Sequence, residues 1–225
     1  MSQLKIIIGN KRYSSWSLRG WLAVKHTGLP FEEIMLQLDT PSFYREIEKY
    51  SKARKVPTLV DGDITVWDSA AIIDYCARLA PAKFWWPEDK AAYAFARSIF
   101  GEMHSGFMEI RTHMPMNLNG QWRELTFSAA LQKELDRVEQ LFTECRENYG
   151  TDGDFLFGGF SAADMMFAPL VTRLDTYGVP LGDTAREYVD AVLAYPALQA
   201  WAKEGKQETD IVDIDQLPEN IKSLG

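Results

Sequence analysis

The sequence predicts an α/β domain with a mixed four-stranded sheet, followed by an all-α helical domain. Two observations lead to this prediction. Short apolar runs alternate with helical patterns only in residues 1–80, whereas later segments repeat apolar residues every three or four positions. The connection PAKFWWPED, rich in proline and aromatic residues, then separates the two parts. We therefore expect domains at 1–80 and 90–225, joined by a linker at 81–89.

The first half of the α/β part has the order strand, helix, strand, helix. LKIIIG (4–9) is short, rich in isoleucine and closed by glycine, which is typical of a buried strand. A helical pattern follows over 15–28, and Gly28 and Pro30 end it. FEEIML (31–36) predicts a second strand, and PSFYREIEKYS (41–51) a short helix.

The second half of this part contains a hairpin and a helix. Thr58–Val60 and Ile64–Trp67 have strand character, with Asp61-Gly62-Asp63 as the turn between them. Asp68–Ala80 predicts a helix that begins with an Asp-Ser pair, since both residue types are favoured at helix starts. A helix after the first strand joins parallel strands, and the hairpin adds antiparallel ones, so we expect a mixed sheet.

The helical domain is predicted from three periodic segments. Lys90–Met114 carries apolar residues at helical spacing and predicts one long helix. Thr126–Tyr149 predicts a second, and GGFSAADMMFAPLVTRL (158–174) opens a third.

Charge and composition exclude several classes of function. The net charge of −8 argues against general nucleic-acid binding. No apolar run is long enough to span a membrane, and the N-terminus has no secretory pattern, so we expect a cytoplasmic protein without a membrane partner. Cys76 and Cys145 lack neighbours at metal-ligand or redox spacing, which favours buried thiols and no metal site. Residues 1–80 are less acidic than the remainder, which fits either a small-anion site or ordinary surface variation.

The stretch YSSWS (13–17) lies between the first strand and the first helix. In open α/β sheets ligands bind at this edge, and a helix N-terminus stabilises an anion such as a thiolate. The loop has no cysteine, so a thiolate would have to come from a ligand. The serines therefore fit either a helix cap or hydroxyl donors to such a ligand, and Ser15 can cap while Ser14 reaches the thiol.

Two further motifs fit a peptide-like ligand. Proline rarely enters a strand, as Pro57 does; if the Val56–Pro57 bond is cis, the Val56 backbone faces the site edge and can pair with an extended peptide. Asp68 and Ser69 fit a simple helix cap. They also fit an amino-acid head group, with Asp68 holding the ammonium and Ser69 the carboxylate.

Taken in order, these motifs resemble a known family. A strand, YSSWS, a helix, VP before a strand and DSAAI within 80 residues resemble the thioredoxin-like domain of cytosolic glutathione transferases. The helical remainder resembles their C-terminal domain, and GFSAAD (159–164) resembles the capping box and staple that open its central helix. SSWS followed by Arg19 is most similar to the serine-type zeta class, as a bacterial member. The resemblance covers nearly the whole chain, except the tail after about Gly205.

The resemblance implies that glutathione is the co-substrate and that no metal is needed. Ser14 would be the catalytic residue that bonds the glutathione sulfur, and Tyr13 is the alternative thiol partner. Ser15 and Arg19 would support the loop and its positive potential, Val56 would pair with the cysteinyl backbone, and Asp68 and Ser69 would hold the γ-glutamyl end. The glutathione-binding residues implied are Ser14, Ser15, Arg19, Lys55, Val56, Asp68 and Ser69.

The leading hypothesis is a glutathione transferase that attacks small hydrophobic electrophiles in detoxification, as a homodimer. A glutathione-dependent cis–trans isomerase, similar to maleylacetoacetate isomerase, and a non-catalytic interaction protein are the alternatives. Trp16 stands where the zeta class has cysteine, which favours the transferase. The electrophile would contact Trp16, His104 and Arg111. The last two, seven residues apart on one predicted helical face, would face an acidic substrate, or would otherwise be solvated or touch a second subunit.

Overall fold

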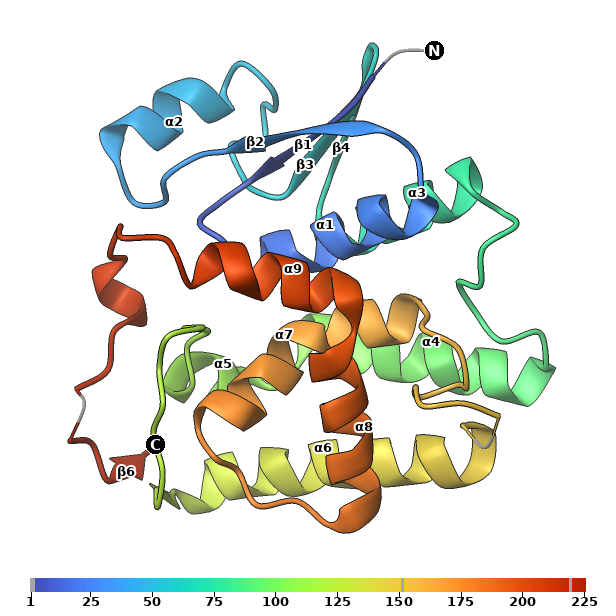
Figure 1. The fold of residues 1–225 in the computed structure, drawn as a ribbon, viewed down its shortest axis with the longest axis vertical. Coiled ribbons are helices and arrows are strands. Elements are labelled where there is room, and N and C mark those ends of the chain that lie inside the picture. Colours follow the sequence, from blue (N-terminus) through green and yellow to red (C-terminus); the bar gives the residue numbers. More distant parts are fainter. Residues whose placement is uncertain (1–2, 151, 219) are drawn as a thin grey trace.

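A four-stranded mixed sheet forms the N-terminal part of the computed structural model, which describes residues 3–150, 152–218 and 220–225 (Figure 1). The strands lie in the order β2-β1-β3-β4. β1 and β2 are parallel, because α1 crosses over between them, and β3 runs antiparallel to β1 and β4. The mixed sheet is therefore confirmed. Its elements are β1 (Leu4–Ile8), α1 (Ser15–Thr27), β2 (Phe31–Met35), α2 (Pro41–Ile47), β3 (Thr58–Asp61), β4 (Ile64–Trp67) and α3 (Ser69–Leu79).

Different helices cover the two faces of the sheet. α1 and α3 lie between the sheet and the helical part, and α2 covers the opposite face (Figure 1). β1 is buried on both sides, since Ile6 and Ile8 join the core shared with α1 while Ile7 packs with Phe43 and Ile47 of α2. The loop after β1 consequently opens at the boundary between the sheet and the helical part.

The second part is helical and is built around α7. Every residue of α7 except Asp175 is buried, and the helix packs against α1, α4 and α8. The Asp164 carboxylate accepts the Ser161 backbone N–H at 2.8 Å, so the predicted bond back to the helix start is present. The helices are α4 (Lys90–Ser105), α5 (Met108–His113), α6 (Ala129–Tyr149), α7 (Ala162–Thr176), α8 (Asp183–Ala194) and α9 (Pro196–Gly205).

The prediction of one helix over Lys90–Met114 is wrong. α4 ends at Ser105, and Phe107 adopts a left-handed conformation with φ 59° before α5 begins. A Cβ at Gly106 would lie 2.8 Å from the Glu102 carbonyl oxygen, so the turn depends on glycine. The Arg111 guanidinium completes the break, because its Nε donates to the Gly106 carbonyl at 2.8 Å.

The start of the predicted helix over Thr126–Tyr149 is also wrong. Thr126 and Phe127 form the short strand β5, which pairs in parallel with β6 (Ser223–Leu224). α6 begins only after Ser128, whose hydroxyl accepts the Leu131 N–H at 3.2 Å. The long-range partner at the C-terminus thus overrides the helical pattern.

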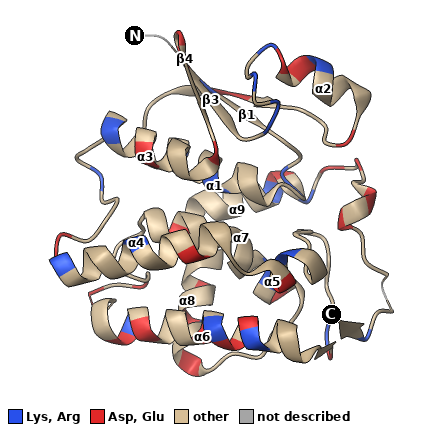
Figure 2. Ribbon diagram, turned by 180° about the vertical axis from the view of Figure 1, so that it is seen from behind, with Lys and Arg blue, Asp and Glu red and all other residues tan. Residues whose placement is uncertain are grey.

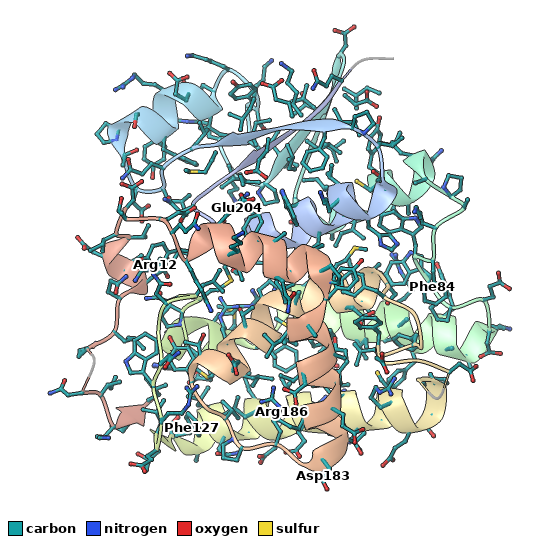
Figure 3. The ribbon with its side chains drawn as sticks, viewed as in Figure 1. Arg12, Phe84, Phe127, Asp183, Arg186 and Glu204 are labelled. Atoms are coloured by element: carbon teal, nitrogen blue, oxygen red, sulfur yellow. The ribbon has the colours of Figure 1, made fainter. Side chains whose placement is uncertain are left out.

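The segment after α9 runs along the edge of the helical part to β6 (red in Figure 1). The Glu208 carboxylate accepts the backbone N–H groups of Lys11 at 2.7 Å and Arg12 at 3.1 Å, and Figure 3 labels Arg12 beside this segment. Further on, the Trp122 indole N–H donates to the Pro218 carbonyl at 3.0 Å. We call residues 209–217 the strap; they include the 3-10 turn η1 (Asp213–Asp215) and are fixed at both ends.

One apolar core joins the two parts. It runs from β1 through Leu18 and Leu22 of α1 to Phe167 of α7. Acidic and basic residues lie side by side along α6 (Figure 2). Among the described residues, no helix combines the length and apolarity needed to cross a bilayer.

Candidate functional site

The serine loop, as we call residues 9–16, follows β1 and is organised by the start of α1. Ser14, not Ser15, caps this helix: its hydroxyl oxygen accepts the Ser17 N–H at 3.3 Å. The Ser14 hydroxyl in turn donates to Ser17 Oγ at 2.7 Å, and Ser17 Oγ also accepts the Gly9 N–H at 3.0 Å. The suggestion that Ser15 caps this helix is therefore wrong. Ser17, which the sequence analysis did not single out, is the present acceptor of the Ser14 proton.

Ser14 and Ser15 line a cavity of about 330 Å³ between the two parts of the molecule. Its walls come from the loops after β1 and β2, from α5, from α7 and from the strap. We call this cavity the serine pocket. It is lined by Tyr13, Ser14, Ser15, Trp16, Leu38, Val56, Arg111, Pro115, Arg173 and Asp215.

A larger cavity of about 650 Å³ adjoins the serine pocket and shares Trp16 and Val56 with it. Most residues predicted for glutathione line one or both cavities, but Arg19 lines neither. Lys55, Asp68 and Ser69 line the larger cavity. It is lined by Trp16, Phe43, Tyr44, Arg54, Lys55, Val56, Pro57, Trp67, Asp68 and Ser69. The Val56–Pro57 bond, which the sequence left open, is cis.

The larger cavity presents an unused donor at the start of α3. Ser69 is 1% exposed, and its hydroxyl has no hydrogen-bond partner among the residues that the structure describes. Asp68 caps α3 through the Ala70 N–H at 2.8 Å and has φ 72° and ψ 134°, outside the regions that L-residues favour. A partnerless buried hydroxyl at a helix N-terminus suits a bound anion.

Side chains from three helices and the serine loop meet at Trp16. The Arg19 and Arg111 Cζ atoms lie 4.5 and 4.8 Å from the centre of the Trp16 ring, and the His104 ring meets it edge-on at 5.5 Å. His104 Nε2 also lies 3.0 and 3.1 Å from the Asp68 carboxylate oxygens. His104 and Arg111 belong to separate helices, so the prediction that they share one helical face is wrong, yet the structure brings both to Trp16.

Three arginines between the two parts bond to backbone carbonyls rather than to acids. Nε of Arg19 donates to Met166 O at 2.8 Å, and Nε of Arg173 to Met114 O at 2.6 Å. Arg111 is the third. Within the described part of the chain, none of the three forms an ion pair with Asp or Glu. Arg19 is 0% exposed, and its Nη1 and Nη2 atoms lack partners among the same residues.

The positive charge of this arginine cluster is poorly compensated. Burial lowers the pKa of Arg19 well below its ordinary value, and the charges of Arg111 and Arg173 lower it further. Burial and the Arg111 charge lower the pKa of Arg173 to about 10, against the smaller opposing effect of the Asp215 charge. Burying a charge in this way costs free energy. Strongly shifted pKa values are also frequent at sites where a protein binds or transforms a ligand. Because Arg111 and Arg173 line the serine pocket, that ligand is expected to carry negative charge.

Comparison with known proteins identifies the fold and the family. The family model for the glutathione S-transferase N-terminal domain matches residues 13–79. The model for the glutathione S-transferase C-terminal domain matches residues 128–204. The chain belongs to the glutathione S-transferase family.

Similar proteins cover nearly the whole chain. A maleylacetoacetate isomerase from Rattus norvegicus is 26% identical over 192 residues, 82% of this chain and 85% of that protein. Glutathione S-transferase Z2 from Arabidopsis thaliana is 26% identical over 213 residues, 88% and 93% of the two chains. A glutathione transferase homologue from Burkholderia, solved with bound glutathione, shares the fold with TM-score 0.69 and 23% identity, covering 92% and 100%. These relatives confirm the predicted zeta-like transferase family and its two-part fold.

The sequence analysis missed two charged residues of the serine pocket. Arg173 had a detectable signal, because it is a lone cation within the apolar stretch of α7. Asp215 had no detectable signal in the sequence, since the tail after about Gly205 carries no motif. Tyr13, the alternative thiol partner, also lines the pocket, but its hydroxyl accepts a hydrogen bond from Gln216, and burial raises its pKa.

We expect Arg19→Met to raise the free energy of unfolding by about 1 kcal/mol. The change keeps the side-chain volume and removes a buried charge whose single bond to Met166 offsets only part of its desolvation. Urea unfolding followed by circular dichroism measures the difference.

Arg137→Met is the matched control. Arg137 forms a half-exposed ion pair with Glu102 at 2.8 Å, so its loss should lower stability by less than about 1 kcal/mol. A loss of more than about 2 kcal/mol in Arg19→Met would contradict the view that the Arg19 charge is uncompensated.

Proposed function

We propose that this glutathione transferase holds glutathione across the two adjoining cavities, with the sulfur beside Ser14. One observation carries the proposal: the larger cavity, which presents the partnerless Ser69 hydroxyl, shares its Trp16 and Val56 wall with the pocket that contains Ser14. A ligand anchored at the start of α3 can thereby reach the start of α1.

The larger cavity suits the charges of the tripeptide. The Ser69 hydroxyl and the α3 N-terminus would take the γ-glutamyl carboxylate, and Asp68 its ammonium. Lys55 supplies a cation for the second carboxylate, and the Val56 backbone would pair with the cysteinyl unit. The ammonium of glutathione would then take the place of His104 as the partner of the Asp68 carboxylate.

The serine loop would stabilise the sulfur as a thiolate. A free thiol has a pKa near about 8.5. The Ser14 hydroxyl proton now directed at Ser17 would turn to the sulfur, while Ser17 keeps its bond from the Gly9 N–H. The α1 N-terminus and the arginine cluster add positive potential, so the pKa of the bound thiol falls. The sulfur lone pair then forms a bond to carbon, and the leaving group departs with its electron pair.

The serine pocket refines the class of electrophile. Leu38, Pro115 and Trp16 offer apolar surface for a small carbon skeleton, as expected for a hydrophobic electrophile. Arg111 and Arg173 add two cations without acidic ion-pair partners in the described residues. We infer that the preferred electrophile carries a carboxylate.

Isomerisation is a second candidate, and the same arginines favour it. The thiolate would add to a cis double bond conjugated to a carbonyl, the single bond formed would rotate, and the thiolate would leave with its electron pair. This isomerisation needs no further reactant, because the thiolate is regenerated when it leaves. The similarity to a maleylacetoacetate isomerase supports this candidate, although that activity is stated only for the relative.

Ser14→Ala should lower kcat/KM for glutathione conjugation by about tenfold to a hundredfold. Loss of the hydroxyl donor raises the pKa of the bound thiol, so the rising limb of the pH profile should move up by about one unit or more. Conjugation of a neutral aryl halide, followed over a range of pH, measures both effects.

Ser98→Ala on the solvent side of α4 is the control and should leave the profile unchanged, since its hydroxyl bonds only the Ala94 carbonyl. Full activity and an unmoved profile in Ser14→Ala would reject the assigned role and point to Ser15 or Tyr13. Absence of glutathione binding to the wild-type chain in calorimetry would instead favour the non-catalytic alternative.

A direct assay separates the two chemical candidates. A cis-configured keto acid with a conjugated double bond is incubated with glutathione and the chain, and the products are resolved by nuclear magnetic resonance. Transferase chemistry should consume glutathione and yield a thioether in equal amount. Recovery of the trans acid with glutathione unconsumed would establish isomerisation and overturn the first candidate for such substrates.

We also propose that the chain forms a homodimer through the edge of its sheet. β4 is an edge strand, and its Ile64 and Trp67 side chains are 50% and 54% exposed. An edge strand with exposed apolar groups is a surface that a partner covers. Light scattering should give twice the chain mass for the wild type, and Ile64→Glu should halve it. Ile214→Glu on the strap should leave the dimer intact; a wild-type monomer would reject the proposal.

A further inference from the structure

The strap places one acidic side chain in the wall of the serine pocket. Asp215 lines this pocket together with Arg111 and Arg173. The neighbouring Gln216 side chain donates to the Tyr13 hydroxyl and accepts from the Asn117 amide at 3.5 Å. The strap is therefore bonded to the serine loop beside the position of Asp215.

The strap is fixed at both ends. Glu208 bonds the backbone of the serine loop on one side, and the Trp122–Pro218 bond and the β5–β6 pair hold the other. Val212 is 3% exposed and anchors the middle of the strap. Asp215 is thus a standing part of the pocket wall and not a group on a loose tail.

The Asp215 carboxylate is left unused by the fold. It is half-buried and makes no hydrogen bond or ion pair with the other residues that the structure describes, whereas Glu208 on the same tail is bonded to two N–H groups. Burial raises the pKa of Asp215 to about 6, the Arg173 charge lowers it, and the Asp39 charge raises it. A carboxylate held in this way acts on whatever enters the pocket.

We propose that Asp215 is a specificity-determining residue of the serine pocket, which makes the pocket prefer electrophiles with one carboxylate over those with two. The proposal rests on the proposed function. The ionised Asp215 offsets one of the two positive charges that Arg111 and Arg173 present. One substrate carboxylate can take up the remaining positive charge, but a second one must approach Asp215, and such like-charge contacts are how proteins reject a competing ligand.

The test compares two electrophiles that differ only in one carboxylate, which is a carboxamide in the second compound. Both carry the same activated double bond, and kcat/KM is measured for each with glutathione. The wild type should prefer the monoacid. Asp215→Asn should raise kcat/KM for the diacid by roughly tenfold and leave the value for the monoacid within about twofold.

Asp213→Asn is the matched control, because Asp213 lies on the same turn but is exposed and does not line the pocket. It should leave both values unchanged. A ratio of diacid to monoacid that Asp215→Asn does not alter would overturn the proposal, as would a wild-type preference for the diacid. Circular dichroism and conjugation of a neutral aryl halide verify that each variant is folded and active.

The pH dependence of the same ratio gives an independent readout. Asp215 faces Arg111, Arg173 and Tyr13 in the pocket, and Asp39 acts on it from the loop after β2. As the pH falls through about 6, Asp215 gains a proton and loses its negative charge. The ratio of kcat/KM for the diacid to kcat/KM for the monoacid should therefore rise in the wild type. Thiol ionisation affects both substrates equally and cancels in the ratio.

The pH dependence measured in Asp215→Asn also tests the proposal. Asp215→Asn should show a ratio that does not vary with pH, provided that both electrophiles stay ionised over the range. A pH dependence that persists in this variant would overturn the assignment to Asp215. If neither acid reacts, the proposal fails; conjugation of the neutral halide then shows that the transferase function itself stands, and its absence shows that both fail.

Discussion

Positive charge that forms no ion pair with a described acidic residue, where the sheet meets the helical part, is the constraint on which the rest of this structure depends. The guanidinium groups of Arg19 and Arg173 also join segments that are distant in the chain. Arg19 connects α1 to α7 through Met166 O, Arg173 connects α7 to the segment after α5 through Met114 O, and Arg111 closes the end of α4. Of these three bonds, that of Arg19 crosses between the two parts, and together they fix three cations where the sheet part meets the helical part. Burial of the large apolar core offsets the free-energy cost of desolvating these charges.

This arrangement would allow a plain serine to serve in the proposed reaction. A hydroxyl is a weak aid to a thiolate in water, but a preorganised donor in a low-dielectric site with fixed positive charge is worth considerably more. In the proposed function Ser14 would need no base of its own, because a cationic environment, a helix N-terminus and a donor would all favour the charged form of the ligand. The same field would favour negative charge on an electrophile, so the proposed sulfur activation and the proposed preference for acids would have one physical origin.

Local patterns predicted most of the fold. The order of elements along the chain, the hairpin and the start of α7 follow from residues adjacent in sequence, and the motifs at Ser14, Val56 and Asp68 line the two adjoining cavities. The features that the sequence did not predict depend on contacts that local patterns do not show. Apolar spacing continues across Gly106, so periodicity alone did not show the break that Arg111 stabilises. Asp215 enters the pocket only because Glu208 and β6 fix a tail that lacks any pattern of its own.

Trp16 shows how one substitution within a motif acts through its neighbours. Its ring lies against the guanidinium groups of Arg19 and Arg111 and meets His104, so it covers buried charge at the wall shared by both cavities. A cysteine at this position is too small to cover a guanidinium and offers no ring face for cation–π contact. The indole thereby keeps solvent from the cations that the proposed reaction needs. In the proposed function, the choice between transfer and isomerisation would then depend on how Arg111 and Arg173 hold the electrophile, and not on a thiol at residue 16.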